Sequence, residues 1–393
     1  MAYAQQTDPP RPARQPLTAV RVHGVDTRAD HRAFLGLPHR LHGDLPLWVP
    51  PLRTEQRRLV DRRANPFFET GSVRLFLARR GRDVVGRIAA VDNPAHNAHH
   101  GTRHGFFGLF DCADDPDAAR ALLASVTAWL RERGHERVVG PVDFTTNDQC
   151  GVLTEGFDEP PAVLMPYNPP YYPGLLAAGG LEPAMDLLAW EIPLDLHERP
   201  RAERLARHVA RTVPGLRVRP VDLRDFAAET AVLRHLYQEA WQHNWGYSPP
   251  SEKEFDALAK LLRRVARPEL VLIAEVAGEP AAFTLVLPDV APALRAARGR
   301  LHTCGVPLGL VRYLRAARRV TRVRVVAAGV LRPYRGRGLD TLLHVEVSRR
   351  ARHLGYRTAE VSWTLADNQA ANRTLAAFGA RVSKRYALYE GPV

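Results

Sequence analysis

Apolar positions recur along this chain with two spacings that alternate from one segment to the next. Residues 73–78 and 84–91 alternate apolar and polar side chains on either side of Arg80-Gly81-Arg82-Asp83, which predicts a β-hairpin. Residues 117–133 instead place apolar side chains at helical spacing, and Gly134 stands where a helix would end. Strands that alternate with helices in this way indicate an α/β fold.

The order of elements occurs twice. In the first half, a strand, a helix, a second strand, a loop and a short helix after Asn168 lead to a further strand. In the second half the same order ends with a short helix after Asn368, then Gly379 and a last strand. We therefore expect tandem copies of one fold. The predicted segments are a disordered tail at 1–16, an N-terminal domain at 17–196 and a C-terminal domain at 197–393.

Composition limits the compartment and the partners. With 393 residues, the chain is long enough for two domains. The sequence has no apolar run long enough to span a bilayer and no apolar leader, which predicts a cytoplasmic protein without a membrane partner. Cys112, Cys150 and Cys304 lie far apart and form no CxxC pair, as expected in a reducing compartment.

Charge favours polyanionic ligands. The formal net charge is +13 and the isoelectric point is about 10.2, so CoA, nucleic acid and anionic lipid all qualify as partners. Arginine supplies nearly all of this charge and is scattered, so part of the excess reflects a compositional bias. One local concentration of arginine stands out, and it consists of Arg312, Arg315, Arg318, Arg319, Arg322 and Arg324. This cluster either attracts a phosphorylated ligand or forms a solvated helix face.

The segment 329–340 passes from a strand pattern through a glycine-containing turn into an amphipathic helix. Gly336 and Gly338 allow the backbone to approach an anion closely, and the first turn of the following helix offers free N–H groups and the positive end of a dipole. Because the turn lies between a strand and a helix, as phosphate binding requires, the segment predicts a phosphate-binding turn.

The order strand, Arg335-x-x-Gly338 turn, helix, strand, Asn368, helix, Gly379 and final strand resembles the GCN5-related N-acetyltransferase (GNAT) superfamily. The resemblance covers the chain from about Leu216 onward. It implies two tandem GNAT-like domains, each a mixed, mostly antiparallel sheet flanked by helices. It also implies that the C-terminal copy binds acetyl-CoA or another acyl-CoA, with no metal. The implied donor-binding residues are Val330, Leu331, Arg335, Gly336, Arg337, Gly338, Leu339, Asp340 and Asn368.

Two positions depart from the family pattern. Asp340 places a carboxylate where the pyrophosphate is expected, and like-charge repulsion there weakens CoA binding unless the carboxylate turns away or is paired. Leu375 replaces the tyrosine that in this family often protonates the departing thiolate, so Tyr386, Tyr389 or an N-terminal tyrosine would have to substitute. In the N-terminal copy, the turn carries Asp114, Asp115 and Asp117, which predicts that this copy has lost cofactor binding.

Acceptor contacts are expected on loops rich in Asn, Asp and Tyr, which often form ligand pockets. A basic amine would lie against the acidic loop 140–161, although the same side chains are also suited to capping turns. The candidate substrate-binding residues are Asp143, Asn147, Asp148, Tyr167, Tyr171, Asn244, Trp245 and Trp363.

Glu360 and Tyr386 are the candidate catalytic residues. Glu360 is either a base that deprotonates an ammonium before attack or an ion-pair partner for nearby arginines. A cluster of histidines, His96, His99, His100 and His104, falls in a segment that we interpret as a solvated loop without a metal.

The function that the sequence favours is acyl transfer from acyl-CoA to an amine of a small molecule, by direct attack on the thioester. One alternative is an aminoacyl-tRNA-dependent transferase of the same fold, with tRNA as donor. The other is a non-catalytic protein that binds CoA or another ligand, which would explain both Leu375 and Asp340.

Overall fold

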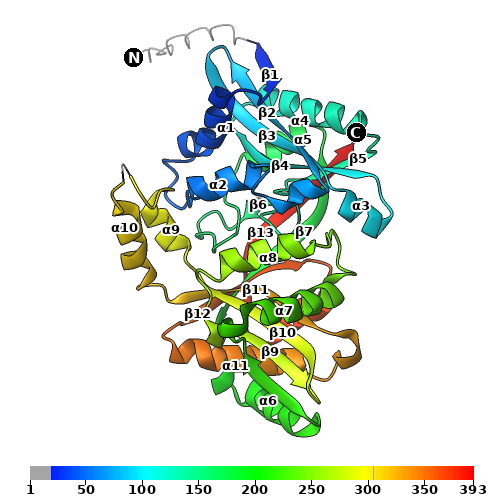
Figure 1. Ribbon diagram of the computed structural model, residues 1–393, viewed down its shortest axis with the longest axis vertical. Helices are drawn as coiled ribbons and strands as arrows, with labels where there is room; N and C mark the ends of the chain where they lie inside the picture. Colours follow the sequence, from blue (N-terminus) through cyan, green and yellow to red (C-terminus); the bar gives the residue numbers. More distant parts are fainter. Residues whose placement is uncertain (1–18, 304) are drawn as a thin grey trace, which may run out of the picture.

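The computed structural model describes residues 19–303 and 305–393, and its centre is one continuous sheet of thirteen strands (Figure 1). The predicted tail at 1–16 and Cys304 therefore lie outside the described residues. Along the sheet the strand order is β1-β2-β3-β4-β5-β13-β7-β12-β11-β10-β9-β8, and β6 pairs with β13 beside this path. The pairs β4–β5 and β11–β12 are parallel and the other pairs are antiparallel.

The elements of the first half are β1 (Val20–Gly24), α1 (Arg28–Leu41), α2 (Arg53–Val60), β2 (Ser72–Arg80), β3 (Asp83–Asp92), α3 (Pro94–His100), β4 (His104–Cys112), α4 (Pro116–Arg131), β5 (Arg137–Gly140), β6 (Val152–Glu155), α5 (Tyr172–Ala178) and β7 (Glu182–Pro193). Those of the second half are α6 (Pro200–Thr212), β8 (Leu216–Pro220), α7 (Phe226–Trp241), α8 (Glu252–Leu262), β9 (Val271–Val276), β10 (Glu279–Pro288), α9 (Ala291–Ala297), α10 (Leu308–Ala317), β11 (Arg322–Val330), α11 (Leu339–His353), β12 (Thr358–Leu365), α12 (Gln369–Ala377) and β13 (Arg381–Pro392). Short 3-10 turns lie at 66–69, 196–198, 223–225, 268–270 and 332–334.

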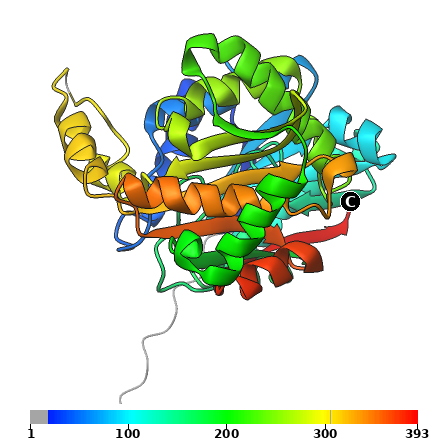
Figure 2. The ribbon, with the colours of Figure 1, turned by 90° about the horizontal axis from the view of Figure 1, so that it is seen from below.

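Helices cover both faces of each half. In the second half, α11 and α6 pack together on one face, and α7 packs on β10 and β11 from the other (Figure 2). Helix α11 buries Leu339, Leu343 and Val347 at intervals of four residues, so one stripe of the helix faces the sheet. In the first half, α4 packs on β1 to β4 and α1 contacts β3 and β4.

The two halves exchange their last strands. Strand β13, the last of the second half, pairs with β5 and β6 of the first half, with Tyr389 opposite Gly140. Strand β7, the last of the first half, pairs with β12 of the second half, with Trp190 opposite Val361. β7 and β13 also pair with each other at the centre of the sheet. Each half therefore completes its sheet with a strand from the other.

The parallel pair of the second half separates part-way along. Arg322–Val325 of β11 pairs with Thr358–Val361 of β12, and neither strand pairs with the other beyond Val325 and Val361. The phosphate-binding turn follows the unpaired end of β11. We refer to this separation, between residues 326–330 and 362–365, as the strand gap.

The fold class is confirmed as α/β with a mixed, mostly antiparallel sheet flanked by helices. None of the helices in the described part of the chain combines the length and the apolar composition needed to cross a bilayer.

Candidate functional site

The phosphate-binding turn has the backbone geometry that its glycines predict. Gly336 and Gly338 adopt φ of 74° and 77°, in the left-handed region that other residues rarely occupy. Gly338 is also the N-cap of α11, and a Cβ at this position would lie 2.7 Å from Cγ2 of Val209. The N–H groups of Gly336 to Asp340 donate to no acceptor within residues 19–303 and 305–393. The turn therefore presents free donors at the start of a fifteen-residue helix.

The backbone of β11 presents a second set of donors to the strand gap. The Leu331 N–H is bonded to the Ala281 carbonyl at 2.9 Å, so Leu331 faces β10. The Ala328 carbonyl instead accepts from Nε1 of Trp241 at 3.0 Å, and the Val330 carbonyl accepts from Nε of Arg335 at 3.1 Å. Because the N–H and C=O of one strand residue point the same way, the amides of Ala328 and Val330 face away from β10, toward the gap.

The remaining predicted donor contacts have defined neighbours. Arg335 holds the turn against α7 through a hydrogen bond to the Ala240 carbonyl, and Arg337 lies 5.6 Å from the ring of Tyr334. Asp340 lies one helical turn before His344, whose pKa is lowered by burial and partly restored by the Asp340 charge. Asn368 caps α12 by accepting from the Ala371 amide at 3.2 Å, which is a structural contact.

A cavity of about 780 Å³ lies between the two halves and is lined mainly by apolar side chains. Val326 and Ala327 of β11 and Ser362 and Trp363 of β12 line it, so it opens into the strand gap. Both strands are irregular there. The register of β10 and β11 shifts around Val326, and that of β12 and β7 shifts between Val361 and Thr364. Such bulges redirect side chains beside a site.

Both halves build the walls of this cavity. The first half contributes α2 and the segments 143–152 and 161–168, and the second half contributes α7, α8 and the α9–α10 region. Loop 143–152 crosses to the second half, where Oγ1 of Thr146 donates to the Gly246 carbonyl at 2.8 Å and Nδ2 of Asn147 donates to the Ser248 carbonyl at 3.1 Å. The cavity therefore exists only where the copies meet.

Two carboxylates face the cavity from this loop. Asp143 accepts from the Leu109 amide at 2.8 Å, and Asp148 accepts from Oγ1 of Thr145 at 3.1 Å. Asp143 is half-buried, whereas Asp148 is exposed at the wall of the cavity. Burial raises the pKa of Asp143 to about 6. Burial raises the pKa of Asp148 to about 7, and the charge of Asp143 adds to that increase.

The cavity contains five of the eight predicted substrate contacts: Asp143, Asn147, Asp148, Tyr167 and Trp363. The other three lie elsewhere. Tyr171 donates its hydroxyl to the Cys112 carbonyl at 3.0 Å, Trp245 packs against a hydrophobic core, and Asn244 accepts from the Tyr247 amide in a turn. These positions make Tyr171, Asn244 and Trp245 structural neighbours of the cavity and not part of its lining.

Two aromatic lining residues were not among the predicted substrate contacts. Tyr237 and Trp241 of α7 face the cavity, and the Tyr237 hydroxyl donates to Oδ1 of Asn147. Trp241 lies 6.4 Å from Trp363 between ring centroids. On the sequence these aromatic residues belong to an ordinary amphipathic helix, so their spacing predicts a packed face as readily as a ligand contact.

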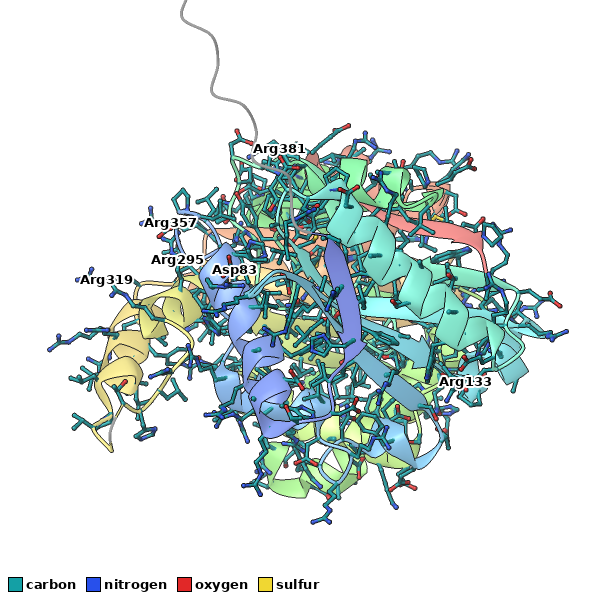
Figure 3. All side chains as sticks on the ribbon, turned by 90° about the horizontal axis from the view of Figure 1, so that it is seen from above. Asp83, Arg133, Arg295, Arg319, Arg357 and Arg381 are labelled. Carbon is teal, nitrogen blue, oxygen red and sulfur yellow. The ribbon has the colours of Figure 1, made fainter. Side chains whose placement is uncertain are left out.

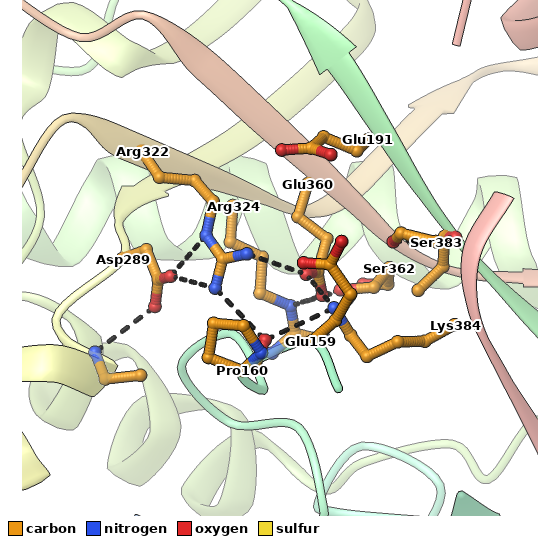
Figure 4. A network of polar contacts seen from close by, with 12 residues as sticks. Glu159, Pro160, Glu191, Asp289, Arg322, Arg324, Glu360, Ser362, Ser383 and Lys384 are labelled. Atoms are coloured by element: carbon orange, nitrogen blue, oxygen red, sulfur yellow. Dashed lines mark hydrogen bonds and ion pairs between the residues drawn. The ribbon is translucent and has the colours of Figure 1, made fainter. Parts of the chain in front are cut away.

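Glu360 lies in a buried ion network and does not itself line the cavity (Figure 4). Its Oε2 is 2.8 Å from Nζ of Lys384 and 3.5 Å from Nη1 of Arg322, and Arg322 also pairs with the buried Asp289 at 2.6 Å. Glu360 and Lys384 are both almost fully buried. This placement favours the ion-pair role that the sequence left open for Glu360 over the role of base.

Tyr386 is also enclosed. It is 0% exposed in a hydrophobic core, its hydroxyl has no hydrogen-bond partner, and burial raises its pKa well above the ordinary value. It does not line the cavity, and neither does Leu375, which packs between Leu188 and Trp190. The geometry therefore gives neither position a path to a substrate.

The histidine cluster lies on a helix, so the prediction of a solvated loop was wrong. His96, His99 and His100 belong to α3, and His104 begins β4. His96 is buried, and burial lowers its pKa to about 4. The run of polar residues suggested a loop because histidine has no strong preference for a helix. In the structure, Pro94 in the first turn and the Asn93 cap start a short helix.

In the N-terminal copy, the positions equivalent to the free donors are occupied by protein. Asp143 takes the Leu109 amide, and the Tyr172 hydroxyl accepts from the Cys112 amide at 3.0 Å. Asp115 caps α4 by accepting from the amides of Asp117 and Ala118. The strand edge and the helix terminus that would bind a donor in this copy are therefore already satisfied.

The comparisons with known proteins define the class. No family model matches the chain. Its fold is similar to that of a tandem GNAT protein from the clavulanic acid biosynthesis pathway (TM-score 0.54, 16% identical, covering 95% of this chain and 98% of that one). It is also similar to a GCN5-related N-acetyltransferase from Sphaerobacter thermophilus (TM-score 0.50, 15% identical, covering 95% of each chain). The chain therefore has the GNAT fold in its tandem form, and it belongs to one family with the two full-length relatives described next.

Two proteins are similar to this chain in sequence along nearly its whole length. The chain is 34% identical over 374 residues to the bacterial ceramide synthase of Caulobacter vibrioides, covering 93% of this chain and 96% of that protein. It is 32% identical over 366 residues to Protein YghO of Escherichia coli, covering 92% of each.

Proposed function

We propose that this protein transfers an acyl group from an acyl-CoA to the amine of an amphipathic, long-chain acceptor. The observation that carries the proposal is the large, mainly apolar cavity that opens into the strand gap and has Asp143 and Asp148 among its lining residues. A small polar amine needs no apolar space of this size, whereas an alkyl chain gains free energy by burial there. The relative from Caulobacter vibrioides is named for ceramide synthesis, which joins an acyl group to the amine of a long-chain base.

The donor side rests on free backbone amides. The N–H groups of residues 336–340 suit the pyrophosphate of CoA, and the strand gap leads from there toward the cavity. The amides of Ala328 and Val330 would donate to the thioester carbonyl and to the oxyanion that forms from it. Binding of the donor in the C-terminal copy alone agrees with the occupied amides of the N-terminal copy.

The acceptor side rests on Asp148 and Asp143. An ammonium is unreactive because its nitrogen has no lone pair, and Asp148 would accept its proton. The neutral amine then attacks the thioester carbon, a C–N bond forms, and the C–S bond breaks. One of the two protons left on nitrogen passes to the departing sulfur, which leaves as free CoA, and the other stays on the nitrogen of the product amide. Asp143 lies beside Asp148 and helps to hold the positive charge of the acceptor before transfer.

Product formation tests this proposal. Purified protein is incubated with acetyl-, octanoyl- or palmitoyl-CoA, each with a short amino alcohol or a long-chain one, and products are identified by mass spectrometry. We expect the long-chain acceptor to be N-acylated and the short one to react poorly. Product from a small polar amine alone would contradict the proposal. Salt-sensitive tRNA binding without CoA turnover would instead favour the tRNA-dependent alternative.

Two variants of the phosphate-binding turn separate donor binding from turnover. Gly338→Glu adds a carboxylate beside the predicted pyrophosphate and a side chain at a positive φ, so it should abolish binding of CoA measured by isothermal titration. Asp340→Gly should tighten binding, because it removes a negative charge from the same helix turn. Unchanged affinity in Gly338→Glu would place the nucleotide elsewhere.

A further inference from the structure

Helices α9 and α10 and the turn that joins them form a hairpin, which we call the α9–α10 hairpin (residues 291–320). It stands away from the body of the molecule in two perpendicular views (Figures 1 and 2). Gly309, near the start of α10, permits close packing against the backbone of Arg300, because a Cβ at this position would lie 1.7 Å from the Arg300 carbonyl oxygen. Thr303 and Val306 exchange two backbone hydrogen bonds of 2.9 and 3.0 Å near its tip. The projection is therefore a built element.

The outward face of the hairpin is apolar. Val306, Leu308, Val311 and Leu314 are 51%, 52%, 43% and 51% exposed. The described part of the chain has only two other large hydrophobic side chains with comparable exposure, Leu205 and Leu354, and both lie outside the hairpin. Leu308, Val311 and Leu314 follow one another at intervals of three along α10, so they share a face. A concentrated apolar patch of this kind marks an interaction surface.

The same face is strongly cationic. Residues 291–320 contain seven arginines and no aspartate or glutamate. Four of these arginines are exposed, and their side chains make no ion pair or hydrogen bond to any described residue: Arg312, Arg315, Arg318 and Arg319. Arg319 extends into solvent at the edge of the molecule (Figure 3). Arginines interleaved with exposed leucines are the composition of a helix that lies at the surface of an anionic bilayer.

The inward face of the hairpin belongs to the cavity. Leu301, Leu310 and Tyr313 line it, so one helix separates the cavity from the apolar outward face. Charge, exposed apolar side chains and continuity with a hydrophobic cavity all identify the same occupant. A soluble acidic protein would satisfy the arginines but would leave the connection to the cavity unexplained.

We propose that the α9–α10 hairpin docks on an anionic lipid bilayer, with Leu308, Val311 and Leu314 entering the interface and the arginines pairing with headgroups. When the hairpin is docked in this way, the cavity beneath it exchanges the long-chain acceptor or product directly with the bilayer. This second statement rests on the proposed function, whereas the docking itself does not. The sequence led us to expect no membrane partner, and this proposal departs from that expectation by assigning a bilayer as a peripheral partner.

The test is co-sedimentation of the full-length protein with vesicles of phosphatidylcholine alone or mixed with phosphatidylglycerol, without any substrate. We expect binding to the anionic vesicles that weakens at high salt. The pair Leu308→Ser with Leu314→Ser should reduce it at least tenfold. The pair Arg315→Gln with Arg318→Gln should weaken it by about fivefold per arginine. The matched control, Leu205→Ser with Leu354→Ser, removes the two exposed leucines elsewhere and should bind as wild type does.

Each result decides the proposal. Absence of binding to anionic vesicles, or equal loss in the control pair, overturns it. Conversion of a dimer to a monomer in the Leu308/Leu314 pair, measured by analytical ultracentrifugation, would assign the face to a second copy of the chain and also overturn it. Activity on detergent-dispersed substrate should stay unchanged in the hairpin variants, so loss of docking and failure of the proposed reaction are distinguishable.

Discussion

Asp148 combines two properties that rarely occur together in one carboxylate. Desolvation by the surrounding protein raises its pKa to about 7, yet its side chain is exposed at the wall of the apolar cavity. A base with a pKa near the working pH is well matched to taking a proton from an ammonium. The sequence identified Asp148 because it lies in a loop dense in polar residues, but its pKa depends on walls contributed by the distant α7 and α8.

The activity of the wild-type protein should therefore rise as pH increases through about 7, because Asp148 must be ionised to accept a proton. Asp148→Asn should lower kcat/KM by about 100-fold and remove this limb of the pH profile. The exposed Asp158→Asn, in the same acidic stretch, is the control. An unchanged acid limb in Asp148→Asn would assign the titration to another group.

Stability gives an independent check with a defined sign. The unfolded carboxyl titrates near 3.9 and the folded one near 7, so the folded state binds the extra proton between these values. The wild-type protein should lose stability relative to Asp148→Asn as pH rises from about 4 to about 7. Thermal unfolding of both proteins across this range measures the difference, and parallel curves would contradict the raised pKa.

The buried pair Glu360 and Lys384 makes a different residue-scale prediction. Lys384→Met should reduce the free energy of unfolding by about 3 kcal/mol, because the buried Glu360 loses its partner at 2.8 Å and keeps the ion pair with Arg322 at 3.5 Å. Adding Glu360→Gln should recover part of the loss. Lys253→Met, which breaks the exposed pair with Glu69, should cost less than about 1 kcal/mol. Equal losses in urea denaturation would refute the assignment.

At the scale of elements, the exchange of β7 and β13 makes each half depend on the other. The pair Tyr389 and Gly140 and the pair Trp190 and Val361 join strands from opposite halves. The helices and strands themselves were largely predictable, since hydrophobic spacing and glycine positions act locally. The exchange was not, because β7 and β13 carry similar apolar patterns and nothing in either strand specifies which copy it completes.

Residues 1–196 and 197–393, expressed separately, should each fail to fold. The first segment lacks the strand between β5 and β7, and the second would place its own β13 beside β12 without β7 between them. Co-expression of the two segments should yield a soluble complex that copurifies. A monomeric segment with cooperative unfolding, measured by circular dichroism and sedimentation, would show that the exchange is dispensable.

At the scale of the whole molecule, the cavity belongs to neither copy alone. Asp143 and Asp148 come from the first half, and its strand gap and most of its apolar helices come from the second. The sequence predicted the glycine turn between β11 and α11, which is a local motif, and five of its candidate substrate contacts line the cavity. It did not predict the cavity, because enclosed volume depends on how two domains meet. Leu109 and Leu164, both lining residues, have positive φ, which local sequence does not predict for leucine.

Narrowing the cavity should change selectivity for chain length. Leu258 of α8 lines the cavity, and Leu258→Trp adds volume facing the open space. The ratio of kcat/KM for the long-chain acceptor to that for the short one should fall about tenfold, since pocket size discriminates among chains by this order. Competition assays with both acceptors measure the ratio. A parallel loss for both acceptors would indicate general misfolding, which a melting temperature would reveal.

The exchanged strands also have a consequence during synthesis. Strand β7 leaves the ribosome long before β12 and β13, the two strands that flank it in the finished sheet. Until then a nascent chain holds an apolar strand with two open edges, which can pair with a neighbouring nascent chain on the same messenger. Slow translation of the second half would prolong the time for which the edges of β7 are exposed. The rate of translation and the supply of chaperones therefore affect the yield of the folded protein.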